Sequence, residues 1–294
     1  MNEKVRSPKE PSSMAPAPAA PAKPSVAKPL PEDALILIPM RNTVLFPGVI
    51  SPITVGRAAS VAAAQEAVRT EKKVGFLLQR NPQTNEVKPE DLYWVGTAGQ
   101  VVRYITGAEG THHLVVQGQS RFRVLEFLPG WPYLVARVQL IEQKDAVSEI
   151  QNPDIEARFL QLKAQAAEAI QLLPNAPEEL TVVVQGMTSP ALLADMVANL
   201  LDIKNEDKQD LLETFDLKRR LDKVIEHLSE RVGVLRISKE IGDRTKKEFD
   251  ERQREHVLRE QMRQIQKELG EGEDTAAELE ELKKGIDDAG MPED

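Results

Sequence analysis

The stretch DLKRRLDKVIEHLSERVGVLRISKEIGDRTKKEFDERQREHVLREQMRQIQKEL, residues 216–269, decides the architecture of this chain, because nothing in it stops a helix. It contains no proline, and its two glycines, Gly233 and Gly242, each cost a helix only about 1 kcal/mol relative to alanine. With a rise of about 1.5 Å per residue, the helix would be roughly 80 Å long. We therefore expect one extended, coiled-coil-like helix over residues 216–270, with Gly270 as its C-terminal stop.

Apolar side chains lie at both ends of this segment and are scarce between them. The stripe near its start consists of Leu221, Ile225, Leu228, Val232 and Leu235. The stripe near its end, the distal stripe, consists of Leu258, Met262, Ile265 and Leu269. Between the stripes, acidic residues stand four positions before arginines, in the pairs Glu240–Arg244, Glu248–Arg252, Asp250–Arg254 and Glu255–Arg259. Such pairs support a helix in water, so the pattern predicts a base that is packed, a middle that is solvated and an end that is apolar.

The distal stripe has two interpretations. It could pack on the chain's own helical segment at 275–289, where a capping-box pattern at Thr275 and Glu278 precedes three apolar residues at helical spacing. It could instead bind another subunit or an unfolded protein, because an exposed apolar stripe that contains methionine is typical of interaction surfaces. The candidate contact residues are Phe249, which lies between the stripes, Leu258, Met262, Ile265 and Leu269.

The segments before the long helix change from strand to helix periodicity. Residues 32–148 contain many short apolar runs and one early alanine-rich helix, which predicts a small, partly closed barrel. We expect Pro39 to close the first strand, Pro52 to mark an edge strand or a bulge, and Gly118 to separate two strands. At Asn152, a helix cap, and Pro153, the period changes, so residues 149–215 predict a helical subdomain. The fold class is α+β.

The two ends of the chain are different in character. Residues 1–31 contain eight prolines and few large apolar groups, which predicts a disordered tail rich in proline and alanine. Residues 271–294 carry ten carboxylates and predict an acidic helical segment. No apolar run approaches the roughly 20 residues that cross a bilayer, and the amino terminus has no secretory apolar region. We therefore expect no membrane contact and a cytoplasmic location.

Composition and motifs exclude most enzymatic chemistry within these 294 residues. There is no cysteine, and the phosphate-cradling, zinc-binding and nucleophile-elbow motifs are absent. Ser25 and Lys28 have the spacing of a catalytic serine–lysine pair, but they lie in the proline-rich tail without a rigid support. We therefore predict no catalytic, cofactor-binding or metal-binding residue. The net charge of −9 argues against general nucleic-acid binding, and the basic cluster Lys218–Arg220 predicts at most weak DNA binding.

Several stretches resemble the Lon protease family. Residues 37–48, LIPMRNTVLFPG, are similar to the opening of its N-terminal domain, and residues 254–271, REHVLREQMRQIQKELGE, are similar to the coiled-coil segment before its ATPase module. The resemblance covers about residues 33–294 and implies a PUA-like pseudo-barrel, a helical bundle and a long helix. Family members continue into an AAA+ ATPase and a serine–lysine protease, so we expect these residues to be an amino-terminal part of such a protein.

The resemblance also implies what this region does. The whole enzyme would use ATP and Mg in its ATPase module and act as a homohexamer that degrades misfolded and regulatory proteins. This region would bind unfolded or tagged protein substrates and associate with itself, as a dimer in isolation. Two alternatives remain open at this point. One is a stand-alone PUA-like module that binds RNA or a small ligand, and the other is a structural coiled-coil scaffold that binds no client.

Overall fold

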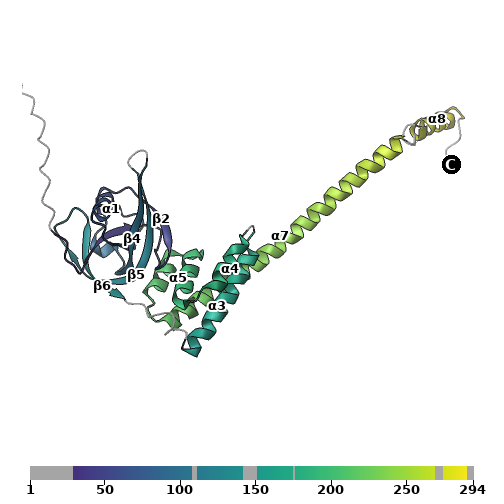
Figure 1. Cartoon of the computed structure of the whole chain (residues 1–294). Helices are drawn as coiled ribbons and strands as arrows, with labels where there is room; N and C mark the ends of the chain where they lie inside the picture. Colours follow the sequence, from purple (N-terminus) through teal and green to yellow (C-terminus); the bar gives the residue numbers. More distant parts are fainter. Residues whose placement is uncertain (1–28, 108–110, 142–150, 175, 269–273, 290–294) are drawn as a thin grey trace, which may run out of the picture.

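The chain forms two compact lobes from which one long helix projects (Figure 1). The computed structural model describes residues 29–107, 111–141, 151–174, 176–268 and 274–289. The first lobe is a β-sheet with one covering helix, and the second is a bundle of helices. The predicted α+β class is therefore confirmed. The predicted tail over residues 1–31 lies almost entirely outside the described residues.

The first lobe is a six-stranded sheet that closes on itself. Its strands are β1 (Ala34–Met40), β2 (Ile50–Val55), β3 (Val74–Leu78), β4 (Val95–Thr106), β5 (His112–Leu128) and β6 (Leu134–Ile141). The order is β2-β5-β4-β3-β1-β6, and β6 also pairs with β5, so five strands form a ring and β2 lies beside it. Closure pairs strand edges that would otherwise be open. The helix α1 (Ala58–Thr70) packs on β1 and β4.

Strand β5 is one continuous strand, and the prediction of two strands separated at Gly118 is wrong. Its first half, residues 112–117, pairs with β2, and residues 121–128 pair with β6 along the same edge, while β4 pairs along the other. Gly118 lies in the middle because a Cβ there would come within 2.3 Å of the backbone oxygen of Phe46. The glycine permits close packing of two backbone segments and does not make a turn.

The predictions for two prolines in the sheet had different outcomes. Pro52 was expected to mark an edge strand or a bulge, and the structure contains the edge strand, because within the described sheet β2 pairs with β5 alone. Pro39 was expected to end β1, but the strand continues to Met40. The carbonyl of Met40 accepts from the backbone N–H of Gln79, directly after β3, so the missing N–H of Pro39 faces the opposite edge. There, β6 pairs only with residues 34–37 of β1. The proline therefore costs the ladder no hydrogen bond.

The second lobe packs four helices around the base of a fifth. These are α3 (Pro153–Leu172), α4 (Glu178–Gly186), α5 (Pro190–Leu200), α6 (Asn205–Glu213) and α7 (Leu217–Glu268). The predicted cap of α3 is confirmed, because the Asn152 side chain accepts from the backbone N–H of Asp154 at 3.0 Å. The core combines Leu162 and Leu193 with Leu221, Val224 and Leu228 of α7. The base of α7 is therefore an integral part of the bundle core.

Beyond this base, α7 extends away from both lobes (Figure 1). Every described residue of α7 from Arg236 onward, for which exposure is described, is exposed to solvent. The structure thus confirms an extended helix that is packed only at its start. A separate helix, α8 (Asp274–Asp288), lies near the far end of α7. No helix in the described part of the chain is long and apolar enough to cross a membrane.

A buried charge cluster joins the two lobes. Asp195 on α5 accepts two hydrogen bonds from Arg121 of β5, at 2.6 and 2.8 Å, and the same guanidinium donates to the backbone carbonyl of Leu212 at 3.0 Å. Arg220 of α7 lies 3.6 Å from the same carboxylate. All three charged side chains are at most 4% exposed. The carboxylate therefore neutralises charges from both lobes where water does not reach.

We predict that Asp195→Asn destabilises the fold. The amide has nearly the same shape but no charge, so Arg121 and Arg220 lose the buried carboxylate that lies against both of them. Removing one partner of a buried ion pair costs about 3–5 kcal/mol of unfolding free energy. Urea unfolding followed by circular dichroism measures the effect. The control Glu240→Gln breaks an exposed ion pair with Arg244 and should cost less than about 1 kcal/mol. Equal stabilities of the two variants would contradict the role of Asp195.

Candidate functional site

The candidate functional surfaces of this molecule are groups of apolar side chains that are exposed to solvent. Within the described residues, no group of three or more histidine, aspartate or glutamate side chains is placed to hold a metal ion. Large apolar side chains, in contrast, are exposed at positions of the barrel, the bundle, α7 and α8. Two of these groups are the end of α7 and the outer face of the helical bundle. Exposed apolar patches of this kind usually mark interaction surfaces.

The distal stripe lies at the end of the projecting helix and is open to solvent. Leu258, Met262 and Ile265 are 51%, 61% and 54% exposed, and Leu269 lies outside the described residues. The apolar residues of α8, Leu279, Leu282 and Ile286, are also more than half exposed. The two apolar faces therefore do not cover each other in this structure. The interpretation that the stripe packs on the following segment of its own chain is not what the structure contains.

Phe249 does not belong to the distal stripe. It is 66% exposed, like the stripe, but it lies thirteen residues before Met262. At about 100° per residue, this spacing places the two side chains roughly 140° apart around the helix. Of the five candidate contact residues, the structure therefore groups Leu258, Met262 and Ile265 on one face and places Phe249 on another.

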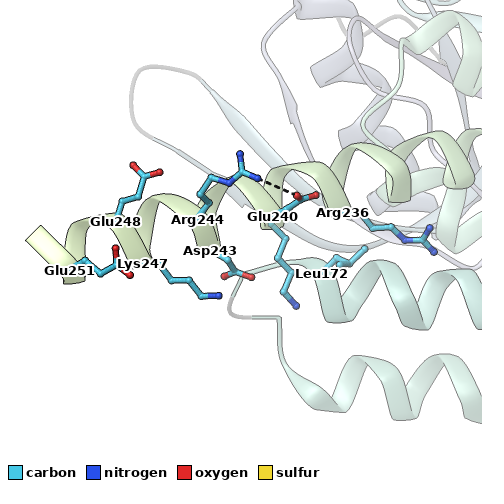
Figure 2. A pocket seen from close by; sticks show the side chains of 9 residues that line it. Leu172, Arg236, Glu240, Asp243, Arg244, Lys247, Glu248 and Glu251 are labelled. Atoms are coloured by element: carbon cyan, nitrogen blue, oxygen red, sulfur yellow. Dashed lines mark ion pairs between the residues drawn. The ribbon is translucent and has the colours of Figure 1, made fainter.

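The part of α7 between the bundle and the distal stripe is a solvated, mixed-charge surface. Figure 2 shows its charged side chains extending from the helix in several directions. Of the four predicted pairs along the described helix, Glu240–Arg244 and Glu255–Arg259 form, at 3.8 and 3.5 Å. Arg236 contacts Glu168 of α3 at 2.5 Å and marks the point where α7 leaves the bundle. This surface keeps a single long helix soluble without burying it.

The bundle contributes an apolar groove that the sequence analysis missed. It encloses about 170 Å³ between α3, α4, α5 and α7, and Ile170, Val184, Met196 and Leu228 are among its lining residues. At its rim, Arg231 lies 3.8 Å from Asp202. Several residues around it that the helical spacing places inward are exposed instead. They are Leu173 at 44%, Leu180 at 45%, Val183 at 51% and Leu200 at 75%.

The exposure of Leu180 and Val183 has a simple cause, because both residues lie on α4. Helix α4 is only nine residues long, and its apolar side chains spread over more than one face. A helix at the outside of a bundle buries one face only, so the remaining apolar positions point to solvent. The available signal was the width of the apolar stripe, which exceeds what one contact with a neighbouring helix can cover.

Comparisons with known proteins identify the family of this fold. The family model "ATP-dependent protease La (LON) substrate-binding domain" matches residues 34–230. The chain is 49% identical over 261 residues to a Lon protease of Methylocella silvestris, covering 89% of this chain and 32% of that protein. It is 48% identical over 269 residues to a Lon protease of Phenylobacterium zucineum, covering 91% and 33%. The chain thus spans about a third of the length of these relatives.

A solved structure supports the fold. The N-terminal domain of the Mycobacterium avium complex Lon protease superposes with a TM-score of 0.55 at 21% identity, covering 67% of this chain and 98% of that chain. The family match covers both the closed sheet and the bundle, including the base of α7. The chain therefore belongs to the LON substrate-binding domain family.

Proposed function

We propose that this chain recognises unfolded or tagged protein substrates and associates with itself, as the amino-terminal region of an ATP-dependent Lon-type protease. The observation that carries the proposal is the distal stripe, an exposed apolar face at the end of a helix that projects from two folded lobes. The family membership of the chain also supports substrate recognition, because the matching family model is that of a substrate-binding domain. Client capture here would depend on apolar surface and reach.

The geometry of α7 suits both parts of this role. A helix of 52 residues extends about 78 Å, so it presents the distal stripe far from the barrel. Met262, at the centre of the distal stripe, has a flexible, polarisable side chain that adapts to varied apolar partners. The same stripe in a second copy offers a matching apolar face, so self-association and client binding would draw on one surface. We propose a dimer for this chain and a homohexamer for the whole enzyme.

Catalysis would belong to other parts of the enzyme. We propose that the whole protein is a serine–lysine endopeptidase that degrades misfolded and regulatory proteins in the cytoplasm, with ATP and Mg bound by an AAA+ module outside this chain. DNA binding by this chain gains little support from its basic cluster. Lys218 is paired with Asp154, and Arg220 is buried beside Asp195. Two of these three cations are thus engaged within the protein.

We predict that Met262→Asp weakens the capture of an unfolded protein. Met262 is 61% exposed, so the change should leave the fold intact while placing a charge in the apolar face. Losing the burial of one methionine side chain weakens binding about ten-fold or more. A pull-down of a chemically unfolded, labelled protein at several concentrations measures the effect.

Val257→Asp is the matched control for this experiment. Val257 is 51% exposed on the same part of α7, but it lies roughly 140° around the helix from Met262. The change should alter capture by less than about two-fold. If the two variants capture the unfolded protein equally well, the distal stripe is not the client-binding surface. A wild-type chain that captures no unfolded protein would instead indicate a structural scaffold.

We predict that shortening α7 lowers the number of subunits in the particle that this chain forms in solution. A chain that ends at residue 242 retains the buried base of α7 and loses the distal stripe, so it should be a monomer while the full chain self-associates. Light scattering after size exclusion measures both masses. A cut at residue 215 is unsuitable, because it removes Leu221, Val224 and Leu228 from the bundle core. The same subunit number in both chains would show that the distal part of α7 is not an assembly element.

A further inference from the structure

A cavity on the barrel, separate from the apolar surfaces, is lined by donors and cations. It has a volume of about 570 Å³ and lies between the loop after β1, strand β2 and the start of α1. Arg41 and Arg57 line it, together with the hydroxyl side chains of Thr43, Thr54 and Ser60. Among the described residues that line it, there is no aspartate or glutamate. The cavity therefore carries two positive charges and no negative one.

Both arginines are held in place by neutral amides. Arg57 donates through Nη2 to the side-chain oxygen of Gln79, and Arg41 donates through Nη2 to the side-chain oxygen of Asn85 at 2.8 Å. Gln79 is only 2% exposed, and its amide nitrogen donates to the backbone carbonyls of Asn81 and Thr84. The Gln79 oxygen is thereby fixed as the acceptor for Arg57. An amide positions a guanidinium group without neutralising it, so both charges remain available to a ligand.

The guanidinium of Arg57 has an unused donor. Its Nη1 atom is buried and has no hydrogen-bond partner within the described part of the chain. Burial and the positive charge of Arg41 both lower the pKa of Arg57 below its usual value. A buried donor without a partner is costly, and two neighbouring cations repel each other. A bound anion would relieve both effects.

The start of α1 adds further donors beside the two arginines. Arg57 occupies the cap position, where its side chain forms no capping hydrogen bond, and the first turn contains no acidic residue. The first N–H groups of a helix lack intrahelical partners and favour an anion. Ser60, in this first turn, lines the cavity and is 5% exposed. Arg57 and Ser60 thus place the start of α1 at the same cavity as Arg41.

We propose that this cavity is a binding site for a phosphate group carried by a small molecule or present as the free ion. The charge of a phosphate dianion balances the charges of Arg41 and Arg57. Its oxygens can accept hydrogen bonds from the donor groups that line the cavity. Guanidinium groups bind phosphate oxygens in a bidentate manner, which a single lysine does not. The cavity is larger than one phosphate ion, so it has room for the organic part of a phosphate monoester.

Isothermal titration calorimetry on the full chain tests the site, with inorganic phosphate and phenyl phosphate as separate probes and ionic strength held constant with chloride. We expect saturable binding of at least one probe to the wild-type chain. Arg57→Gln and Arg41→Gln should each weaken it about ten-fold or more, because each removes a charge-assisted hydrogen bond. Arg41 is exposed, so Arg41→Gln keeps the test valid if Arg57→Gln fails to fold.

Arg103→Gln is the matched control, because it removes an exposed arginine of the same barrel outside the cavity. It should leave the affinity within about two-fold of wild type. Binding of inorganic phosphate alone would assign the free ion, and tighter binding of phenyl phosphate would assign a phosphate monoester. Absence of saturable binding of either probe, or equal affinity in Arg41→Gln, Arg103→Gln and the wild type, would overturn the proposal.

Discussion

The relative placement of the barrel and the bundle depends on one buried carboxylate. Asp195 lies between Arg121 from the barrel and Arg220 from the base of α7, and water screens none of these charges. Charges removed from water must be compensated in a fixed geometry, which restricts how the lobes can move against each other. Gln209 adds a buried hydrogen bond to the backbone carbonyl of Val95 in β4. Because Arg220 is at the start of α7, this contact also helps to fix the direction in which the helix projects.

The projecting part of α7 is stable in water for reasons unlike those of its base. The base is held by apolar burial among Leu162, Leu193 and its own Leu221 and Val224. The exposed middle has only local ion pairs and helix propensity, each worth tenths of a kcal/mol. The distal stripe lies near the end of this helix, where its described side chains are more than half exposed. The reach and the apolar end are thus two properties of one element.

The sequence predicted those features that depend on local periodicity, caps and uninterrupted helix. The extent of α7, the cap at Asn152 and the edge position of β2 follow from such signals. The predictions at Gly118 and Pro39 were wrong because each residue's role is set by a segment distant in sequence. Phe46 approaches Gly118, and the short reach of β6 leaves the edge at Pro39 open. The apolar groove was missed because four helices form it together.

By itself, the sequence determined that a long solvated helix follows a strand-rich and a helix-rich region, because helix propensity, proline positions and apolar spacing are properties of neighbouring residues. Only the tertiary structure decided which charges are buried and which are free. Arg121 and Arg220 converge on Asp195, whereas Arg41 and Arg57 meet around a cavity without a carboxylate. Their different roles arise from the folding of distant segments together, which sets the solvent access and the neighbouring charges of each guanidinium group.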